Sequence, residues 1–189
     1  STITTLTIDN GASLGSGIAN EGNIGTLDIN ADTTYSGSGS ISNALEVAQG
    51  DTLTIGGNGT LNFHATNGTI NNAGIINGTI DNMKESSILV FDNSGSITGI
   101  INNGHIVKFT NNASGIIDNF VNDNTISFFE NNGVIKDFSG DGIIYGVLNS
   151  KEITGDFENV ATSLQNTGTI TGNVQLIGNQ QNCGNDICI

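Results

Sequence analysis

The chain has 189 residues and a net charge of −14, from 18 acidic side chains against four basic ones. Its length indicates one domain with a buried core. The four basic residues are lysines spread along the chain, so no basic patch can form, which argues against a nucleic-acid or anionic-membrane partner. The longest apolar run covers residues 88–91. It is far shorter than the roughly 20 residues that cross a bilayer, so we expect no membrane insertion by this segment.

The composition favours strands and tight turns and contains neither proline nor tryptophan. Ile and Thr favour strands, whereas the 27 Gly and 29 Asn residues tolerate left-handed turns. In the N-terminal region, 1–65, alternating apolar and polar positions predict strands with one buried face, at residues 6–8, 27–29, 45–47, 53–55 and 61–63. Gly/Ser-rich spacers separate these strands, so the rungs they form should be irregular.

A nonapeptide repeat starts near residue 66. Each unit reads Asn, variable, Gly, variable, Ile, with a second apolar residue three positions later. The first apolar position is occupied by Ile70, Ile80, Ile88, Ile97, Ile106, Ile117, Ile126, Ile135, Ile144, Ile153, Ala161 and Ile170. Units this short cannot bury a core alone, so they must stack on their neighbours as a β-solenoid.

The slot three positions before each Ile shows that one turn of the solenoid contains two units. In alternate units the slot is acidic or amide: Glu85, Asn103, Asp123, Asp141 and Glu158. In the units between, it is mainly hydroxylic: Ser94, Ser114, Asn132, Ser150 and Thr167. We therefore expect about ten rungs of roughly 18–20 residues, each rising by one strand spacing. Two apolar positions three apart cannot both point inward from a flat strand, so a bend is expected between them.

Equivalent side chains should stack from rung to rung. Phe91, Phe109 and Phe129 form one predicted core column, and Phe120 and Phe138 form another. Amide ladders are expected at the corners, from Asn93, Asn102, Asn122, Asn131 and Asn149. The position two before each Ile is usually Gly, which predicts a corner with positive φ; the positions are Gly95, Gly104, Gly115, Asn124, Gly133, Gly142, Asn159 and Gly168.

Strings such as GTINNAGIINGTI at 68–80 and GDTLTI at 50–55 resemble the passenger domains of bacterial autotransporters. The resemblance covers almost the whole chain and lies in composition and repetition. It implies an all-β, right-handed parallel β-helix that forms one domain over residues 1–189. Within that domain we expect less regular rungs at 1–65, nonapeptide-pair rungs at 66–177 and a C-terminal cap at 178–189. The membrane-embedded translocator of that family is not in this chain.

Two cysteines close to the end, Cys183 and Cys188, favour one disulfide, because secreted proteins pair their cysteines. A metal site would need two further ligands, and His64 and His105 are remote in sequence. Two free thiols are the remaining alternative. The disulfide would hold a loop over the last rung, where unpaired strand edges invite end-to-end pairing.

The acidic slot, three positions before the Ile of alternate units, is the most distinctive chemical feature of the sequence. Asp123 and Asp141 lie one rung apart, at a separation of roughly 4.8 Å, near that of the carboxylate pair in retaining glycosidases. A polysaccharide-degrading enzyme or glycan-binding domain that uses this edge is therefore the alternative function. Against catalysis, the chain has no arginine or tryptophan and few aromatic residues for a sugar platform. A speculative calcium edge is formed by Asp123, Asp141 and Glu158; we predict no firm metal or cofactor site.

The leading functional expectation follows from the resemblance. It is a non-catalytic, secreted or bacterial cell-surface adhesin whose solenoid faces mediate cell adhesion or self-association. Its partners would be like molecules on neighbouring cells, or a protein or glycan of a host surface. The resemblance implies an extracellular location at the outer membrane, through a translocator outside this chain, and a role in virulence.

Overall fold

The computed structural model describes residues 1–177, 181–183 and 186–188, and it describes side chains through residue 177. In this part the chain is all β and has no helix, so none that is long and apolar enough to cross a membrane. The N-terminal strands are β1 (Thr2–Ile8), β2 (Ile18–Ala19), β3 (Asn23–Ile29), β4 (Thr33–Ser36), β5 (Ser40–Val47), β6 (Thr52–Ile55), β7 (Thr60–Phe63), β8 (Gly68–Asn72) and β9 (Ile75–Asn82).

The nonapeptide repeat forms strands of six or seven residues from β10 to β16, and strands of three to ten residues after them. They are β10 (Ser87–Asn93), β11 (Ser96–Asn102), β12 (His105–Asn111), β13 (Ile116–Asn122), β14 (Thr125–Asn131), β15 (Val134–Ser139), β16 (Ile143–Asn149), β17 (Glu152–Gly155), β18 (Phe157–Asn166), β19 (Thr169–Thr171) and β20 (Val174–Leu176). Two short strands follow, β21 (Gln181–Cys183) and β22 (Asp186–Cys188).

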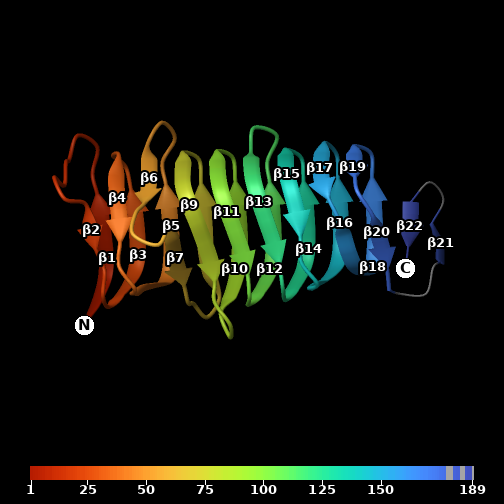
Figure 1. Ribbon diagram of the computed structural model, residues 1–189, viewed down its shortest axis with the longest axis horizontal. Helices are drawn as coiled ribbons and strands as arrows, with labels where there is room; N and C mark the ends of the chain where they lie inside the picture. The colour runs from red at the N-terminus through yellow and green to blue at the C-terminus, as the bar shows by residue number, and fades with distance from the viewer. Residues whose placement is uncertain (178–180, 184–185, 189) are drawn as a thin grey trace.

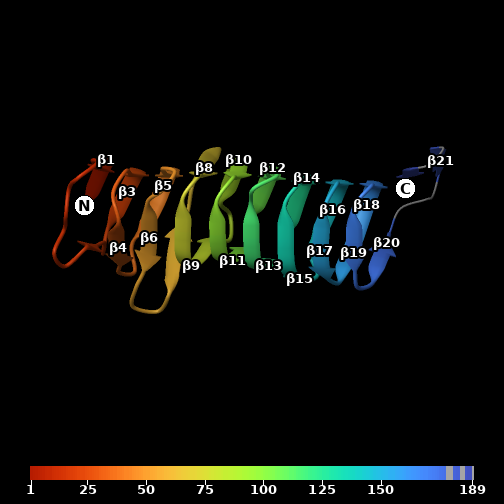
Figure 2. The same cartoon turned by 90° about the horizontal axis from the view of Figure 1, so that it is seen from above.

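Successive strands alternate between two parallel ladders. The first ladder contains β1, β3, β5, β8, β10, β12, β14, β16, β18 and β20. The second contains β2, β4, β6, β9, β11, β13, β15, β17 and β19, and β7 pairs with both β5 and β9. The chain is thus a parallel β-solenoid of about nine turns, where about ten were expected. Figures 1 and 2 show it as a rod with the termini at opposite ends.

The register confirms that two nonamers make one turn. Ile88 pairs with Ile106, and Ile126 pairs with Ile144, so each Ile meets its equivalent two units further along the chain. Ile106 pairs with Ile126 across a slightly longer turn. The spacing is less regular in the N-terminal region, where the turn that joins Leu45 to its partner Ile70 is longer still.

Each repeat strand bends at its middle, as the spacing of the apolar positions requires. In β10 the inward residues are Ile88, Phe91 and Asn93, while Leu89 and Val90 both point outward between the first two. Two consecutive outward residues break the strict alternation of a flat strand, so the chain turns between them.

The core consists of stacked columns of Ile and Phe. The ring centroids of Phe109 and Phe129 lie 4.9 Å apart with nearly parallel planes, and those of Phe120 and Phe138 lie 5.2 Å apart. The two columns also contact each other, because Phe109 and Phe120 are 4.9 Å apart in an edge-to-face arrangement. Both predicted columns are therefore confirmed, and together they form one continuous core.

Asparagines at the strand ends, all buried except Asn166, form two amide ladders, one at each edge of the rod, which are named upper and lower as they lie in Figure 1. The upper amide ladder runs through Asn72, Asn93, Asn111, Asn131, Asn149 and Asn166, in each case from Nδ2 to the next Oδ1 at 2.7–2.9 Å. The lower amide ladder links Asn82, Asn102 and Asn122 at 2.7 and 2.8 Å. The predicted ladders are thus confirmed, divided between the two edges.

Most of the corner glycines do not have the positive φ that the repeat predicted, so that prediction is wrong. Among the predicted positions only Asn159 has positive φ, and in the later turns the left-handed glycines are instead Gly140, Gly155 and Gly172. At Gly133 the constraint is space, because an added Cβ would lie 2.3 Å from the carbonyl oxygen of Gly115. Stacked turns therefore require glycine for close backbone approach rather than for a left-handed conformation.

At the C-terminal end, β22 pairs antiparallel with β18 and with β21. This is the one change of strand direction in the part of the chain that the structure describes. The side chains of Cys183 and Cys188 lie outside the described residues, so the predicted disulfide remains a prediction.

Candidate functional site

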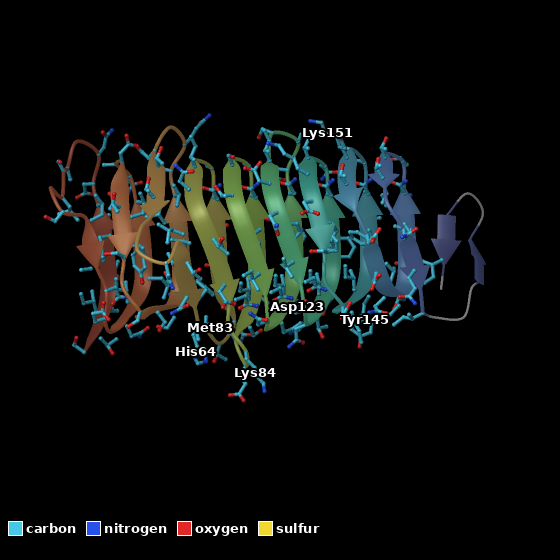
Figure 3. The ribbon with its side chains drawn as sticks, in the orientation of Figure 1. His64, Met83, Lys84, Asp123, Tyr145 and Lys151 are labelled. Atoms are coloured by element: carbon cyan, nitrogen blue, oxygen red, sulfur yellow. The ribbon has the colours of Figure 1, made fainter. Side chains whose placement is uncertain are left out.

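The acidic slot lies on the lower edge of the rod, formed by the turns that lead from second-ladder strands to first-ladder strands. Asp123 and Asp141 are exposed in the turns before β14 and β16, and the pairing of Thr125 with Ile143 stacks these turns. Figure 3 shows Asp123 on this edge with Lys84, while Lys151 lies on the opposite, upper edge. The turns contact each other through amides, as where Asn159 Nδ2 donates to the backbone oxygen of Asp141 at 2.8 Å.

Glu158 lies in a strand rather than in a turn. It is half-buried in β18 beside the core residue Phe157. The register is irregular at this strand, where Ile144 pairs with Val160 and Gly146 with Ser163. The next residue, Asn159, is the one that contacts the turn of Asp141.

Calcium gains no support from the arrangement of carboxylates. Within residues 1–177, no three His, Cys, Asp or Glu side chains gather into a group that could hold a metal ion. The calcium edge therefore stays a prediction. His64 is exposed, and His105 Nε2 lies 2.8 Å from Ser127 Oγ on the neighbouring strand.

A second acidic feature, which the repeat did not reveal, lies towards the N-terminal end. Asp28 pairs with Glu46, Glu46 with Asn71, and Asn71 with Asp92, all pointing outward from the first ladder. These four side chains line a shallow groove of about 340 Å³. The turns that separate the four positions all differ in length, so a regular period could not align them.

Side chains in the turns of the upper edge form hydrogen bonds with neighbouring turns. Asn112 Nδ2 donates to Ser94 Oγ at 2.9 Å, and Ser150 Oγ donates to Asn132 Oδ1 at 2.6 Å. Lys151 Nζ donates to the backbone oxygen of Ala113 at 3.2 Å. The hydroxylic slot therefore fixes one turn against the next.

Apolar side chains point outward from the middle of both ladders. On the first face, defined as the outer side of β10, β12, β14 and β16, the register aligns Leu89, Val107, Ser127 and Tyr145 in one row. Leu89 and Tyr145 are 44% and 46% exposed. On the outer side of the second ladder, Ile75 and Ile116 occupy one register position and are similarly exposed. Serines interrupt both rows, Ser127 on the first face and Ser96 on the second ladder, so each row presents apolar and hydroxyl groups together.

The chain matches no protein-family model and no curated protein sequence, and its fold matches no solved structure. The residues therefore define an architecture, a parallel β-solenoid. Its lower edge carries carboxylates, its upper edge contains the longer amide ladder, and apolar side chains point outward from its faces.

Proposed function

We propose that this chain is a passenger-type domain of a secreted or bacterial cell-surface adhesin, which acts without catalysis through the faces of its solenoid. The single observation that carries the proposal is the row Leu89, Val107, Ser127 and Tyr145 on the first face. Two of its members are more than 40% exposed on a rigid, regular surface. Because these side chains share one register position, they present a regular line of contacts to a partner.

The mechanism follows from repetition on a rigid rod. Each outward side chain contributes one weak contact, and the ladder holds successive contacts at the strand spacing of roughly 4.8 Å. A partner that matches this spacing engages many contacts together, so affinity grows by avidity. The partner is a like molecule on a neighbouring cell, or a protein or glycan on a host surface.

Charge sets the conditions for self-association. Two copies with a net charge of −14 repel each other, and this repulsion is screened beyond roughly 8 Å at physiological salt. Contact between like faces should therefore strengthen as ionic strength rises. Adhesion to a neutral ligand should change little with salt.

The alternative, a polysaccharide-degrading enzyme that uses Asp123 and Asp141, makes a different prediction. Asp123→Asn would abolish turnover of a polysaccharide and leave the protein folded. Adhesion requires no turnover and tolerates this substitution. A broad polysaccharide panel that yields shortened products with the native chain, but not with the variant, would favour the enzyme.

The proposal is tested first by sedimentation velocity from low to high micromolar concentration at physiological salt. A dimer that grows with concentration supports self-association, whereas an elongated monomer throughout supports adhesion to a different partner. Beads coated with the chain are then mixed with each other and with cultured cells, and albumin-coated beads serve as control. Coated beads that neither cluster nor attach to cells above the control would refute the adhesive function.

A further inference from the structure

Only two described aromatic side chains point outward, and they lie on neighbouring strands. The other described aromatic residues are buried in the core: Tyr35, Phe63, Phe91, Phe109, Phe120, Phe129, Phe138 and Phe157. The two exceptions are Phe128 on β14 and Tyr145 on β16. Phe128 pairs with Gly146, the residue after Tyr145, so the two side chains leave neighbouring strands at adjacent positions of the first face. Figure 3 shows Tyr145 projecting from the rod near its lower edge.

The Phe128 ring lies close to the glycine next to Tyr145. A Cβ added at Gly146 would lie 3.4 Å from Phe128 Cδ2, at ordinary van der Waals contact. The ring therefore lies over the neighbouring strand while it remains half-exposed. An aromatic side chain fixed on the surface loses little conformational entropy when a ligand binds.

A small polar groove lies further along the same strands, towards the upper edge. Two positions along β14 from Phe128, Glu130 forms one wall of a groove of about 190 Å³. The other lining residues are Asn132, Leu148, Asn149, Ser150, Gln165 and Thr167. This volume is below the roughly 300 Å³ of the smallest pockets that enclose a small molecule. The groove can therefore seat the polar edge of a ligand whose flat part lies on the rings.

A hydrogen-bond relay positions the carboxylate in the groove. Glu130 Oε1 accepts a hydrogen bond from Asn132 Nδ2 at 2.9 Å, and Asn132 Oδ1 accepts one from Ser150 Oγ at 2.6 Å. This relay orients Glu130 and leaves its second oxygen, Oε2, with no hydrogen-bond donor among the described residues. Gln165 brings an amide to the same groove from the neighbouring strand β18.

We propose that Tyr145, Phe128 and the Glu130 groove form a binding site for an uncharged oligosaccharide, which rests on the adhesive function proposed above and gives it a ligand class. The C–H face of a pyranose ring carries small positive charges and lies favourably on the negative face of an aromatic ring. Sugar hydroxyls donate to a carboxylate and exchange hydrogen bonds with side-chain amides and hydroxyls. An aromatic surface beside a groove of carboxylate, amide and hydroxyl groups presents both kinds of contact.

The charges select against anionic sugars. Two lysines lie near the site: Lys108, which pairs with Phe128 in the ladder, and Lys151, which follows the groove residue Ser150. Lys151 Nζ already donates to the backbone oxygen of Ala113 at 3.2 Å, and Lys136 forms an ion pair with Asp118 at 2.7 Å on the other ladder. The carboxylate of Glu130 in the groove and the net charge of −14 disfavour sulfate and sialic acid groups at this site.

The test measures binding of the full chain to an immobilised panel of glucose-, galactose-, mannose- and N-acetylglucosamine-based oligosaccharides. Sialylated and sulfated oligosaccharides are included on the same surface. We expect binding to one or more uncharged members and none to the anionic ones. Titration calorimetry with the best free oligosaccharide should then give about tenfold weaker binding for Tyr145→Ala and for Phe128→Ala, which corresponds to a loss of about 1.4 kcal/mol each. Glu130→Gln should weaken binding while keeping the shape of the groove.

Ile3→Ala is the matched control, because Ile3 is 49% exposed and lies on β1 at the far end of the rod from the site. It should bind the oligosaccharide as the native chain does, and circular dichroism should show that all variants keep their β structure. No binding to any uncharged oligosaccharide, or equal affinity of the Tyr145→Ala variant, would overturn the proposed site. A preference for anionic oligosaccharides would overturn it as well.

The bead assay separates failure of the site from failure of adhesion. Suppose that the native chain binds no oligosaccharide, and that beads coated with the Tyr145→Ala variant still cluster or attach to cells as the native beads do. This result supports the adhesive function and rejects the sugar site. Clustering that is lost in Tyr145→Ala without any oligosaccharide binding identifies a second copy of the chain as the occupant of this surface and also rejects the sugar site. Failure of both assays with the native chain rejects both proposals.

Discussion

The upper amide ladder makes a quantitative prediction at its centre. Asn111 is fully buried; its Oδ1 accepts from Asn93, and its Nδ2 donates to Asn131 at 2.8 Å and to the backbone oxygen of Gly115 at 3.2 Å. Asn111→Ala removes the donor to Asn131 Oδ1, which is itself buried, and the best acceptor of Asn93 Nδ2. A buried polar group left without a partner costs about 1–3 kcal/mol, so two weakened amides lower the free energy of unfolding by about 2–6 kcal/mol.

The end of the same ladder supplies the control. Asn166 accepts one amide hydrogen bond from Asn149 at 2.7 Å but is exposed, so water can replace it in Asn166→Ala. That substitution should cost less than about 1 kcal/mol. Urea denaturation followed by circular dichroism, with similar m-values for both variants, compares the two free energies directly. If they differ by less than about 1 kcal/mol, burial does not control the strength of the ladder and the reasoning is refuted.

Three further outcomes follow from single contacts. Gly133→Ala should lower the free energy of unfolding by about 1–3 kcal/mol, because its Cβ would overlap a backbone oxygen of the neighbouring turn. Val47→Asn should cost little, since Val47 pairs with Asn72, whose buried Oδ1 has no hydrogen-bond partner and would gain a donor. Burial raises the pKa of Tyr35 above its ordinary value, so the folded state holds this proton more tightly and stability falls as pH rises above about 10.

Each of these outcomes has its own comparison. Gly15→Ala meets no atom within 4 Å and should leave stability unchanged; an equal loss in both glycine variants would contradict the crowding argument. Val147→Asn buries an amide in the core without an amide column beside it, and it should be clearly worse than Val47→Asn. The alkaline loss of stability should be smaller in Tyr35→Phe, and an identical pH profile would show that another group is responsible.

Much of the fold could be predicted because the same nonapeptide repeat recurs many times along the chain. An inward Ile and Phe separated by two outward positions recur in successive units, so the stack, the bend and the Phe columns follow from spacing alone. The adjacent pair Phe128 and Phe129 shows the strength of this pattern, since the period places Phe129 inward and the structure buries it while Phe128 points outward. The asparagines at the strand ends were likewise recognisable, because one amide per rung at a fixed position can bond to the next.

The sites were harder to predict, because they depend on where the period fails. The register becomes irregular at β18, where Glu158 lies, and Asp28, Glu46 and Asp92 come together across turns of unequal length. A local sequence pattern does not predict such insertions and deletions. The register between two turns is set by which side chains of both turns are buried together, and this depends on residues far apart in the sequence.

The sequence by itself determined the architecture, because burial of a periodic apolar pattern leaves a stacked parallel solenoid as the consistent solution. The tertiary structure alone decided which polar and aromatic groups meet on the surface. Outward residues are not restrained by the core, so their neighbours depend on the register between turns. Gly133 illustrates both points. The glycine was visible in the sequence repeat, but the reason for it is visible only in the stacked structure. There, a Cβ added at Gly133 would lie 2.3 Å from the carbonyl oxygen of Gly115 in the neighbouring turn.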